Sequence, residues 1–425
     1  MTIDGILVPR TIAIIGTLDT KSSEILYLKK FIEAKGFRTQ VIDVSMLRHE
    51  FGCSADVKSS EVAIAGGSDI QEISTSKDRN LGTVAMGSGL RKILSEYVNA
   101  KMIDGVVSVG GAQGTSISST AMKELPIGFP KLIVSAVASG NIRPFVGAKD
   151  IAIMFSVADI NGGVNPVTRT VLSNAAAAVM GMVSEGQRME MNHQRQIIGI
   201  TSWGTTQRAV TAASEKLRAL GYDTVIFHSS GACTSAMESL VEQGVIDGVL
   251  DLTTHDFLGE IFPQELMPPV TPGRFTNAAK RGIPLVIAPG GLSMFVMGPY
   301  EELSEQIRHR PLLKHNPAYT EVRLTLDELL KVAVRMAERL NATRGYCAFL
   351  APLKGWNDYD AEGSPLYNVD DDAIFVRKLR ELTDPRIEFH EFDGNLNEEM
   401  FGEIAAELLA KGLSRKYPLS GIENS

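Results

Sequence analysis

Two glycine-rich segments of the chain have the composition of anion-binding loops. The first is Gly16-Thr-Leu-Asp-Thr-Lys21, which follows an apolar run of strand length, and the second is Gly110-Gly-Ala-Gln-Gly-Thr115, which follows another. Glycine lets the backbone approach a ligand closely, and the free N–H groups at the start of a following helix favour negative charge. We therefore predict that the two segments bind a phosphate or a carboxylate, through Gly16, Thr17, Asp19, Thr20, Lys21, Gly110, Gly111, Gly114 and Thr115.

Neither segment matches a standard nucleotide-binding motif. With Lys21 in the lysine position of a Walker loop, Ile15 and Thr20 stand where that motif requires glycine. In the second segment, Val109 stands where the first glycine of a dinucleotide-binding motif would be. A non-Walker anion site is one interpretation, and an ordinary helix N-cap at Asp19 or Thr20 is the other.

Three further polar residues extend the predicted anion site. Ser135 opens the small-residue segment Ser135-Ala-Val-Ala-Ser-Gly140, and Arg169 follows a polar loop. Arginine can pair with a phosphate or a carboxylate, although a structural salt bridge is an equal alternative for Arg169. Lys354 follows a late apolar run and either closes on an anionic ligand from the second half of the chain or is a solvated loop lysine.

His255 and Asp256 are the best candidates for a catalytic acid or base, because histidine titrates near neutral pH. Glu260 and His228 could join them around a metal ion. The spacing lacks a tight ligand motif such as His-Glu-x-x-His, so we predict no metal site. Cys233 is predicted to be a small structural residue and not a nucleophile, since no partner can be assigned to it.

The elements that must position these residues form an internal repeat. Short apolar runs alternate with amphipathic helix patterns, which is typical of a parallel sheet covered on both faces. Residues 12–43 align without a gap on 197–228, residues 102–108 match 245–251, and 128–134 resemble 282–288. We predict an α/β protein with two Rossmann-like, doubly wound parallel-sheet domains.

The repeat also gives domain boundaries. We predict a nucleotide- or phosphate-binding domain over residues 1–190 and a second domain with a C-terminal extension over 191–425. The offset between the copies falls by 42 residues after the first match, which places an insertion near 44–90. That insertion is polar and rich in glycine, and it is either a lid or binding loop or a solvated excursion.

The composition limits the class of protein. Of the 425 residues, 44% are hydrophobic and 22% charged, and the formal net charge is −8, so no nucleic-acid partner is expected. Three widely spaced cysteines, Cys53, Cys233 and Cys347, do not suggest a disulfide framework. We find neither a signal-peptide pattern nor an apolar run of the ~18 residues that a membrane span needs. These features predict a soluble cytoplasmic protein without a membrane partner.

The order of the motifs resembles the family of the tomato mosaic virus resistance protein and its uncharacterised bacterial homologues, whose N-terminal domain binds ATP. The resemblance covers nearly the whole chain. The segments that carry it are Gly16–Lys21, Gly110–Thr115, Phe129-Pro-Lys131 with Ser135, Ser156-Val-Ala-Asp-Ile160, Asn174-Ala-Ala-Ala177, Pro289-Gly-Gly291, Pro352-Leu-Lys-Gly355 and Phe392-Asp-Gly-Asn-Leu-Asn397.

The second half departs from the family pattern at two places. Thr253-Thr-His-Asp256 stands where a Thr-Thr-Thr-Glu type is expected, and Gly291-Leu-Ser-Met294 stands where an Ala-Leu-Asp-Met type is usual. A nucleotide pocket shared with the family is therefore better supported in the first domain than shared chemistry in the second.

The resemblance implies ATP as cofactor, with or without Mg²⁺, and a homodimer or other homo-oligomer. The plant protein continues into a half that resembles a TIM barrel, so a separately encoded barrel partner is a further hypothesis. The leading prediction is a cytoplasmic ATP-binding protein whose reaction the sequence does not assign. The alternatives are an enzyme or enzyme subunit acting on a keto acid or sugar acid in a cleft between the domains, with His255, Asp256 and Lys354, and a regulatory binding module without turnover.

Overall fold

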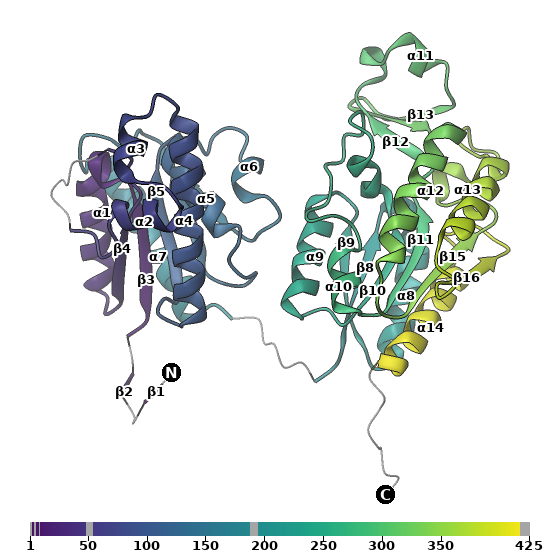
Figure 1. Ribbon diagram of the computed structural model, residues 1–425, viewed down its shortest axis with the longest axis horizontal. Coiled ribbons are helices and arrows are strands. Elements are labelled where there is room, and N and C mark those ends of the chain that lie inside the picture. The colour runs from purple at the N-terminus through teal and green to yellow at the C-terminus, as the bar shows by residue number, and fades with distance from the viewer. Residues whose placement is uncertain (1, 4–5, 8, 48–53, 188–193, 417–425) are drawn as a thin grey trace, which may run out of the picture. The chain divides into compact units, whose positions relative to one another are not determined.

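The computed structural model describes residues 2–3, 6–7, 9–47, 54–187 and 194–416. It divides into two compact units, Met1–Met189 and Glu190–Ser425, and each is described by itself (Figure 1). Cys53 lies outside the described residues.

The first unit is built on a sheet of five parallel strands in the order β4-β3-β5-β6-β7. Numbered from β3 along the chain, this is the doubly wound order 2-1-3-4-5. The central strands are buried on both faces, which explains why each reads as a continuous apolar run. The five strands are β3 (Thr11–Gly16), β4 (Arg38–Asp43), β5 (Gly105–Gly110), β6 (Lys131–Ser135) and β7 (Ala152–Phe155).

Helices cover both faces of the first sheet (Figure 1). On one face, α1 (Leu18–Glu33) and α7 (Pro166–Ser184) share a core cluster that includes Ile25 and Leu172. On the other face, α4 (Arg79–Asn99) and α5 (Ala112–Met122) share a second cluster. The short elements of the unit are β1 (Thr2–Ile3), β2 (Ile6–Leu7), α2 (Ser59–Ala65), α3 (Ile70–Thr75) and α6 (Arg143–Val146).

The predicted insertion at 44–90 contains α2, α3 and the first half of α4. Its glycines allow close helix packing, because a Cβ placed on Gly89 would lie 1.9 Å from the carbonyl oxygen of Val62, and one on Gly66 would lie 2.1 Å from that of Ala85. The segment also adds buried apolar side chains such as Met86 to the core. The glycine-rich composition therefore has a packing cause, and a role as a lid or binding loop stays a prediction.

The second unit repeats the strand order of the first. Its six parallel strands run β16-β15-β11-β10-β8-β9, so five of them again follow the order 2-1-3-4-5 and β16 is added at one edge. The prediction of two doubly wound α/β domains is confirmed. The six strands are β8 (Ile197–Ser202), β9 (Asp223–His228), β10 (Gly248–Thr253), β11 (Leu285–Gly290), β15 (Cys347–Pro352) and β16 (Glu388–Phe392).

Helices also flank the second sheet, and apolar side chains of the C-terminal helix α14 (Glu399–Lys416) and of α8 (Gln207–Ala219) share one core cluster. The other helices of this unit are α9 (Ala232–Gln243), α10 (Thr276–Arg281), α11 (Glu305–Arg308), α12 (Leu326–Asn341) and α13 (Val369–Leu382).

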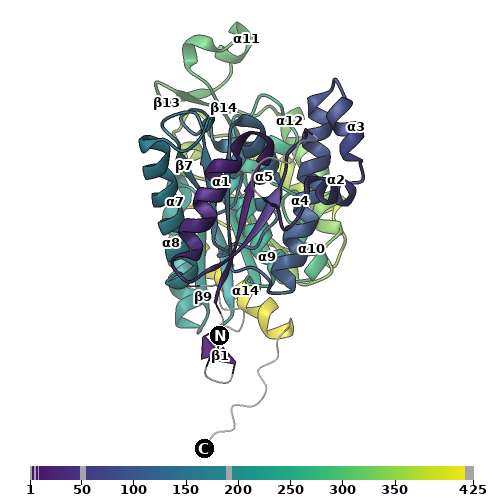
Figure 2. The ribbon, with the colours of Figure 1, turned by 90° about the vertical axis from the view of Figure 1, so that its left-hand side faces the viewer.

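An antiparallel sheet comes after the carboxyl end of β11 and projects from one end of the second unit (Figures 1 and 2). Its three strands lie in the order β12-β14-β13, and the chain between them carries α11. The strands are β12 (Met294–Met297), β13 (Leu312–Asn316) and β14 (Tyr319–Arg323). We call residues 291–325 the antiparallel excursion.

Candidate functional site

The first predicted loop connects β3 to α1, and side chains of the same unit already occupy the start of that helix. The Leu18 N–H donates to Oδ1 of Asp43 at 3.1 Å, and the Asp19 N–H donates to Oγ of Ser45 at 3.1 Å. The next two amides donate to the Thr17 carbonyl oxygen. The first turn of α1 therefore offers an incoming anion few unused N–H groups.

Lys21 is the most unusual residue of this loop, because it is a cation that is only 9% exposed. Its Nζ donates to the carbonyl oxygen of Ile160 at 2.7 Å. Within the described part of the chain, no carboxylate lies within ion-pairing distance of Nζ. A buried charge is costly without a counter-charge, so this ammonium favours an anion nearby.

The second predicted loop connects β5 to α5 and is open. No acceptor for the N–H groups of Ala112, Gln113 and Gly114 is found among the residues that the structure describes. Gly111, the N-cap residue, has free space around it, since a Cβ placed there would meet no atom within 4 Å. Unused amides and the positive end of the helix dipole together make a binding site for a negative group.

Gly110 is needed for a different reason. A Cβ at this position would lie 2.9 Å from the backbone of Gly114 and of Thr115, closer than real side chains come. The glycine therefore allows the end of β5 to approach the first turn of α5, which sets the direction of the open amides.

The structure brings most of the predicted first-domain residues to one edge of the sheet. Gly16 of β3 pairs with Val109 of β5, and Gly110 pairs with Ser135 of β6. The Thr115 and Ser135 hydroxyls lie 2.7 Å apart. The chain leaves β3 in one direction and β5 in the other, so this edge is the topological switch point at which doubly wound sheets bind ligands.

Two predicted anion-binding residues are not joined to this edge by any described contact. Arg169 is exposed in the first turn of α7, whose leading amides are capped by Asn165 Oδ1. Lys354 lies in the second unit just after β15, where its Nζ pairs with Asp393 at 2.9 Å and its side chain is 55% exposed. Their predicted roles stay predictions.

A strained turn comes after β7 at the same edge of the first sheet. Val157 has a φ of +64°, although valine is β-branched, and its side chain is 66% exposed. The Ala158 N–H donates to the Ser156 carbonyl oxygen at 2.6 Å, which closes a γ-turn around Val157. The buried Ser156 hydroxyl holds the turn by donating to the Ala158 carbonyl oxygen.

The corresponding edge of the second sheet is filled by a buried charged network. Arg274 is fully buried, and its guanidinium donates to Asp251 Oδ1, which also accepts from the Thr201 hydroxyl at 2.7 Å. Burial raises the pKa of Asp251 to about 6, although the neighbouring Arg274 charge lowers it. Burial likewise raises the pKa of nearby Glu238 to about 7.

His255 and Asp256 are both fully buried and belong to different networks. Asp256 Oδ2 accepts from the Gly231 N–H at 2.8 Å and from the Thr234 hydroxyl, while Oδ1 lies 3.4 Å from Arg274 Nη1. His255 Nδ1 lies 2.7 Å from the carbonyl oxygen of Gly291 and Nε2 lies 3.3 Å from Glu265 Oε1. They do not form one acid–base pair here, and a catalytic role for either stays a prediction.

The helix that comes after β8 is also closed. Asn397 Oδ1 accepts from the N–H groups of Arg208 and Ala209, at 2.8 and 3.3 Å. Asn397 thus caps α8, as Asp43 and Ser45 cap α1 in the first unit. Among the described residues, the first amides of α5 have no such cap.

Sequence reasoning missed several residues that define these sites. Asp43 ends the second strand and Ser45 follows it, and nothing in their spacing pointed to α1. Arg274 lies in an irregular loop, but Asp251 was a usable signal, because a charged residue within an apolar strand requires a buried partner.

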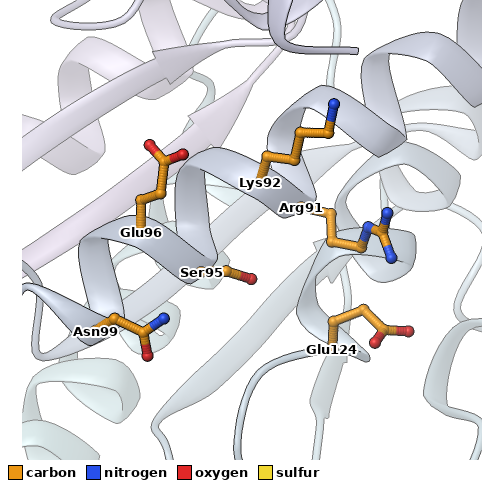
Figure 3. Close-up of a pocket in the computed structure, with 6 residues that line it drawn as sticks. All are labelled: Arg91, Lys92, Ser95, Glu96, Asn99 and Glu124. Atoms are coloured by element: carbon orange, nitrogen blue, oxygen red, sulfur yellow. The ribbon is translucent and has the colours of Figure 1, made fainter. Parts of the chain in front are cut away.

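A surface cavity of about 340 Å³ lies elsewhere on the first unit (Figure 3). Its side chains come from the C-terminal half of α4 and from Glu124, two residues after the end of α5, which puts it away from the carboxyl ends of the strands. Ligand pockets are mostly apolar, and this lining is polar and charged, so we assign it no function. The lining residues are Arg91, Lys92, Ser95, Glu96, Asn99 and Glu124.

Among the described residues, no helix has the length and apolar character needed to cross a bilayer. The same part of the chain holds no group of three or more histidine, cysteine, aspartate or glutamate side chains placed to bind a metal ion.

The fold and the open switch point define a two-domain, doubly wound α/β protein with a candidate anion site in its first domain. The chain belongs to the uncharacterised protein family UPF0261. The model of the family's N-terminal domain matches residues 10–188, and that of its C-terminal domain matches residues 195–413.

Similar proteins come from bacteria and from a plant. A UPF0261 protein of Clostridium tetani is 39% identical over 94% of this chain and 98% of its own length. One from Rhizobium meliloti is 33% identical over 93% and 97%. The ToMV resistance protein Tm-1(GCR237) of Solanum lycopersicum is 34% identical over 87% of this chain but only 51% of its own length. The predicted resemblance is confirmed, and this chain matches about half of the plant protein.

The two segments that depart from the family pattern lie against each other. A Cβ placed on Gly291 would lie 3.0 Å from Cβ of His255, and the two residues share a hydrogen bond. The glycine therefore leaves room for the histidine side chain, and the two segments are in direct contact.

Proposed function

We propose that this protein binds ATP or a related nucleotide in its first domain, with phosphate oxygens held by the open N–H groups at the start of α5. The observation that carries the proposal is that Ala112, Gln113 and Gly114 have unused amides at the switch point of the sheet. The motif resemblance supports the same ligand. Homodimer formation, a cytoplasmic location and a barrel partner stay predictions of that resemblance.

Lys21 supports an anionic ligand independently. Its ammonium is buried beside the end of β3, the strand next to β5, and has a neutral carbonyl oxygen as its partner. A phosphate at the switch point would supply the missing negative charge. Thr17 and Thr20, whose hydroxyls lie 3.0 Å apart in the same loop, can donate to further phosphate oxygens.

The most direct test is Gly111→Asp. Gly111 has an extended backbone and open space, so an aspartate is tolerated and acts as an N-cap whose carboxylate takes the α5 amides. We expect ATP affinity to fall at least tenfold by isothermal titration, while the melting temperature stays the same or rises. The matched control is Gly111→Ala, which adds a Cβ without a carboxylate and should bind within about threefold of the unchanged protein.

An unaltered affinity in Gly111→Asp would contradict the α5 site. A ligand series then distinguishes the alternatives: ATP, ADP, AMP and inorganic phosphate, each with and without Mg²⁺, against small keto and sugar acids. A nucleotide site predicts that affinity falls as phosphates are removed. Binding of a keto or sugar acid in preference to every nucleotide would favour the metabolite-binding alternative, because the same amides also accept a carboxylate.

A further inference from the structure

Three buried ionisable side chains join the antiparallel excursion to the parallel part of the second unit. His255 lies in the 3-10 turn after β10 (His255–Glu260), Glu265 in the loop after that turn, and Glu321 in β14. The side chains of His255 and Glu265 are fully buried, and Glu321 is 5% exposed. We call these three residues the acid–histidine cluster.

Glu265 is the centre of this cluster. Its Oε1 accepts from the Met267 N–H at 2.8 Å and lies 3.3 Å from His255 Nε2. Its Oε2 accepts from the Val296 N–H of β12 at 3.0 Å, and the Leu266 N–H donates to the Val296 carbonyl oxygen at 3.1 Å. The Glu265 loop is thus hydrogen-bonded to the first strand of the excursion through one residue.

Glu321 reaches the cluster from the neighbouring strand. It is the partner of Val296 in the pairing of β12 with β14. Its Oε2 is buried without a hydrogen-bond partner among the described residues. A second buried carboxylate next to Glu265 is unfavourable unless it is protonated or a positive charge lies close.

The surrounding elements supply few other charges. His228 at the end of β9 and Asp256 are the further titratable groups near His255. Asp256 is itself paired with Arg274. On the side of Glu321, a further titratable group is Tyr359, which senses the Glu321 charge and whose hydroxyl lies 2.9 Å from His315 Nδ1. Trp203 stacks on His255 at 4.0 Å between ring centres and adds no charge.

Protonation favours the closed arrangement. Burial opposes a charge on His255, but the Glu265 carboxylate outweighs it and raises the pKa of the imidazole above its usual value. Burial also raises the pKa of Glu321 to about 7. Both groups hold their protons more tightly in the folded cluster than in the unfolded chain, so both contribute stability that is lost as the pH rises.

We propose that the acid–histidine cluster is a proton-controlled latch that holds the antiparallel excursion on the second sheet at mildly acidic pH and loosens it at alkaline pH. The excursion begins at the carboxyl end of β11, beside β10. Its opening uncovers His255 itself and loosens the cover over this edge of the sheet, where Asp251, Asp256 and Arg274 lie.

Hydrogen exchange of the full-length protein at pH 5.5 and pH 8.0, corrected for intrinsic exchange rates, tests the latch. We expect peptides of β12 and β14 to lose about tenfold in protection between the two values, corresponding to one pKa unit of linkage. Glu321→Gln keeps the shape of the side chain but removes its titratable carboxyl group. This variant should therefore lose at most half as much protection between the two pH values. Glu301→Gln, at an exposed glutamate of the excursion, is the matched control and should behave like the unchanged protein.

An NMR titration of the histidine ring signals of the unchanged protein provides a second readout. The His255 signal is assigned by its loss in a separate His255→Gln sample. The latch predicts a midpoint for His255 above 6.5. Equal protection of β12 and β14 at both pH values, the same loss in Glu321→Gln as in the unchanged protein, or a His255 midpoint below 6.5 would each overturn the proposal.

Discussion

The two sheets share one strand order but differ at their carboxyl edges, because the first edge is open and the second is closed by buried side chains. In the first unit, the loop after β5 leaves amides at the start of α5 unused, and Gln113 and Ser116 are partly exposed there. In the second unit, the loop after β10 turns inward, and His255, Asp256 and Arg274 are all fully buried, with Asp256 paired to Arg274 and His255 next to Glu265. The same topology therefore presents a binding edge in one copy and a closed, charged interior in the other.

The difference comes from the element that each strand leads into. After β5 the chain enters a regular helix, whose first amides have no partner unless a cap supplies one. After β10 the chain enters a short 3-10 turn, and residues 261–275 follow it. Glu265 of that segment accepts a hydrogen bond from the Val296 N–H of β12. A ligand can replace a missing cap at the first edge, whereas buried charged side chains already pair with one another at the second.

The largest effect is expected where the closed edge loses the fully buried guanidinium of Arg274. Arg274→Met should lower the free energy of unfolding by about 3–5 kcal/mol, because Asp251 and Asp256 then stay buried without their counter-charge. Urea unfolding followed by fluorescence measures this change. Arg386→Met, which breaks the exposed pair with Asp384, is the control and should change stability little. A small effect of Arg274→Met would mean that the second edge is not closed by this network.

The next largest effect is expected at the open edge. Gly110→Ala places a Cβ 2.9 Å from the backbone of Gly114 and Thr115, so the strand end and the helix start must separate. We expect a loss of up to about 3 kcal/mol in stability and a strong loss of nucleotide binding. Thermal unfolding and titration calorimetry measure the two effects. The neighbouring Gly111→Ala should show neither, and equal behaviour of the two variants would contradict the described geometry.

The pH dependence of stability should also separate the two units. Burial raises the pKa of Glu238 and of Asp372 to about 7, and both lie in the second unit. The unfolded carboxyls release their protons at lower pH than the folded ones, so stability falls as the pH rises from 5 to 7, by about 2 kcal/mol for Glu238 alone. Hydrogen exchange in α9 should show this loss, and α5 should show less. Glu238→Gln should reduce the slope in α9, and an unchanged slope would contradict the assignment.

The smallest effect tests which helix start binds the ligand. Ser45→Ala removes the acceptor of the Asp19 N–H and should cost about 1 kcal/mol in stability. Because the ligand is proposed to lie at α5, ATP affinity should stay within about twofold by titration calorimetry. Ser414→Ala, at an exposed position of α14, is the control for handling and expression. A large change in affinity for Ser45→Ala alone would move the phosphate site to α1.

The sequence predicted the elements better than their contacts. The gapless match of 12–43 with 197–228 indicated two copies of one unit, because apolar strands and helix stripes leave a periodic pattern. The glycines of 110–115 likewise marked a close strand-to-helix turn, which Gly110 confirms by its geometry.

The remaining features depend on pairs of residues that are distant in the chain. Asp43 caps α1 from 25 residues away, and Lys21 meets the carbonyl of Ile160 across 139. The burial of His255 under β12 and Glu265 depends on the antiparallel excursion, for which the sequence carried no repeat to compare. The sequence therefore predicted which residue types lie at the strand ends, but it did not predict whether those residues are exposed or buried.

Val157 gives the open edge one more property. Most of the molecule satisfies local preference and global fold together, with apolar strands buried and helices capped. The γ-turn around Val157 goes against both. Valine is β-branched and disfavours the positive φ that it has here, and its apolar side chain is exposed to solvent. In the terms of energy landscapes, this edge is locally frustrated, whereas the strands behind it are not. Small rearrangements of the chain should therefore cost least where the proposed ligand arrives.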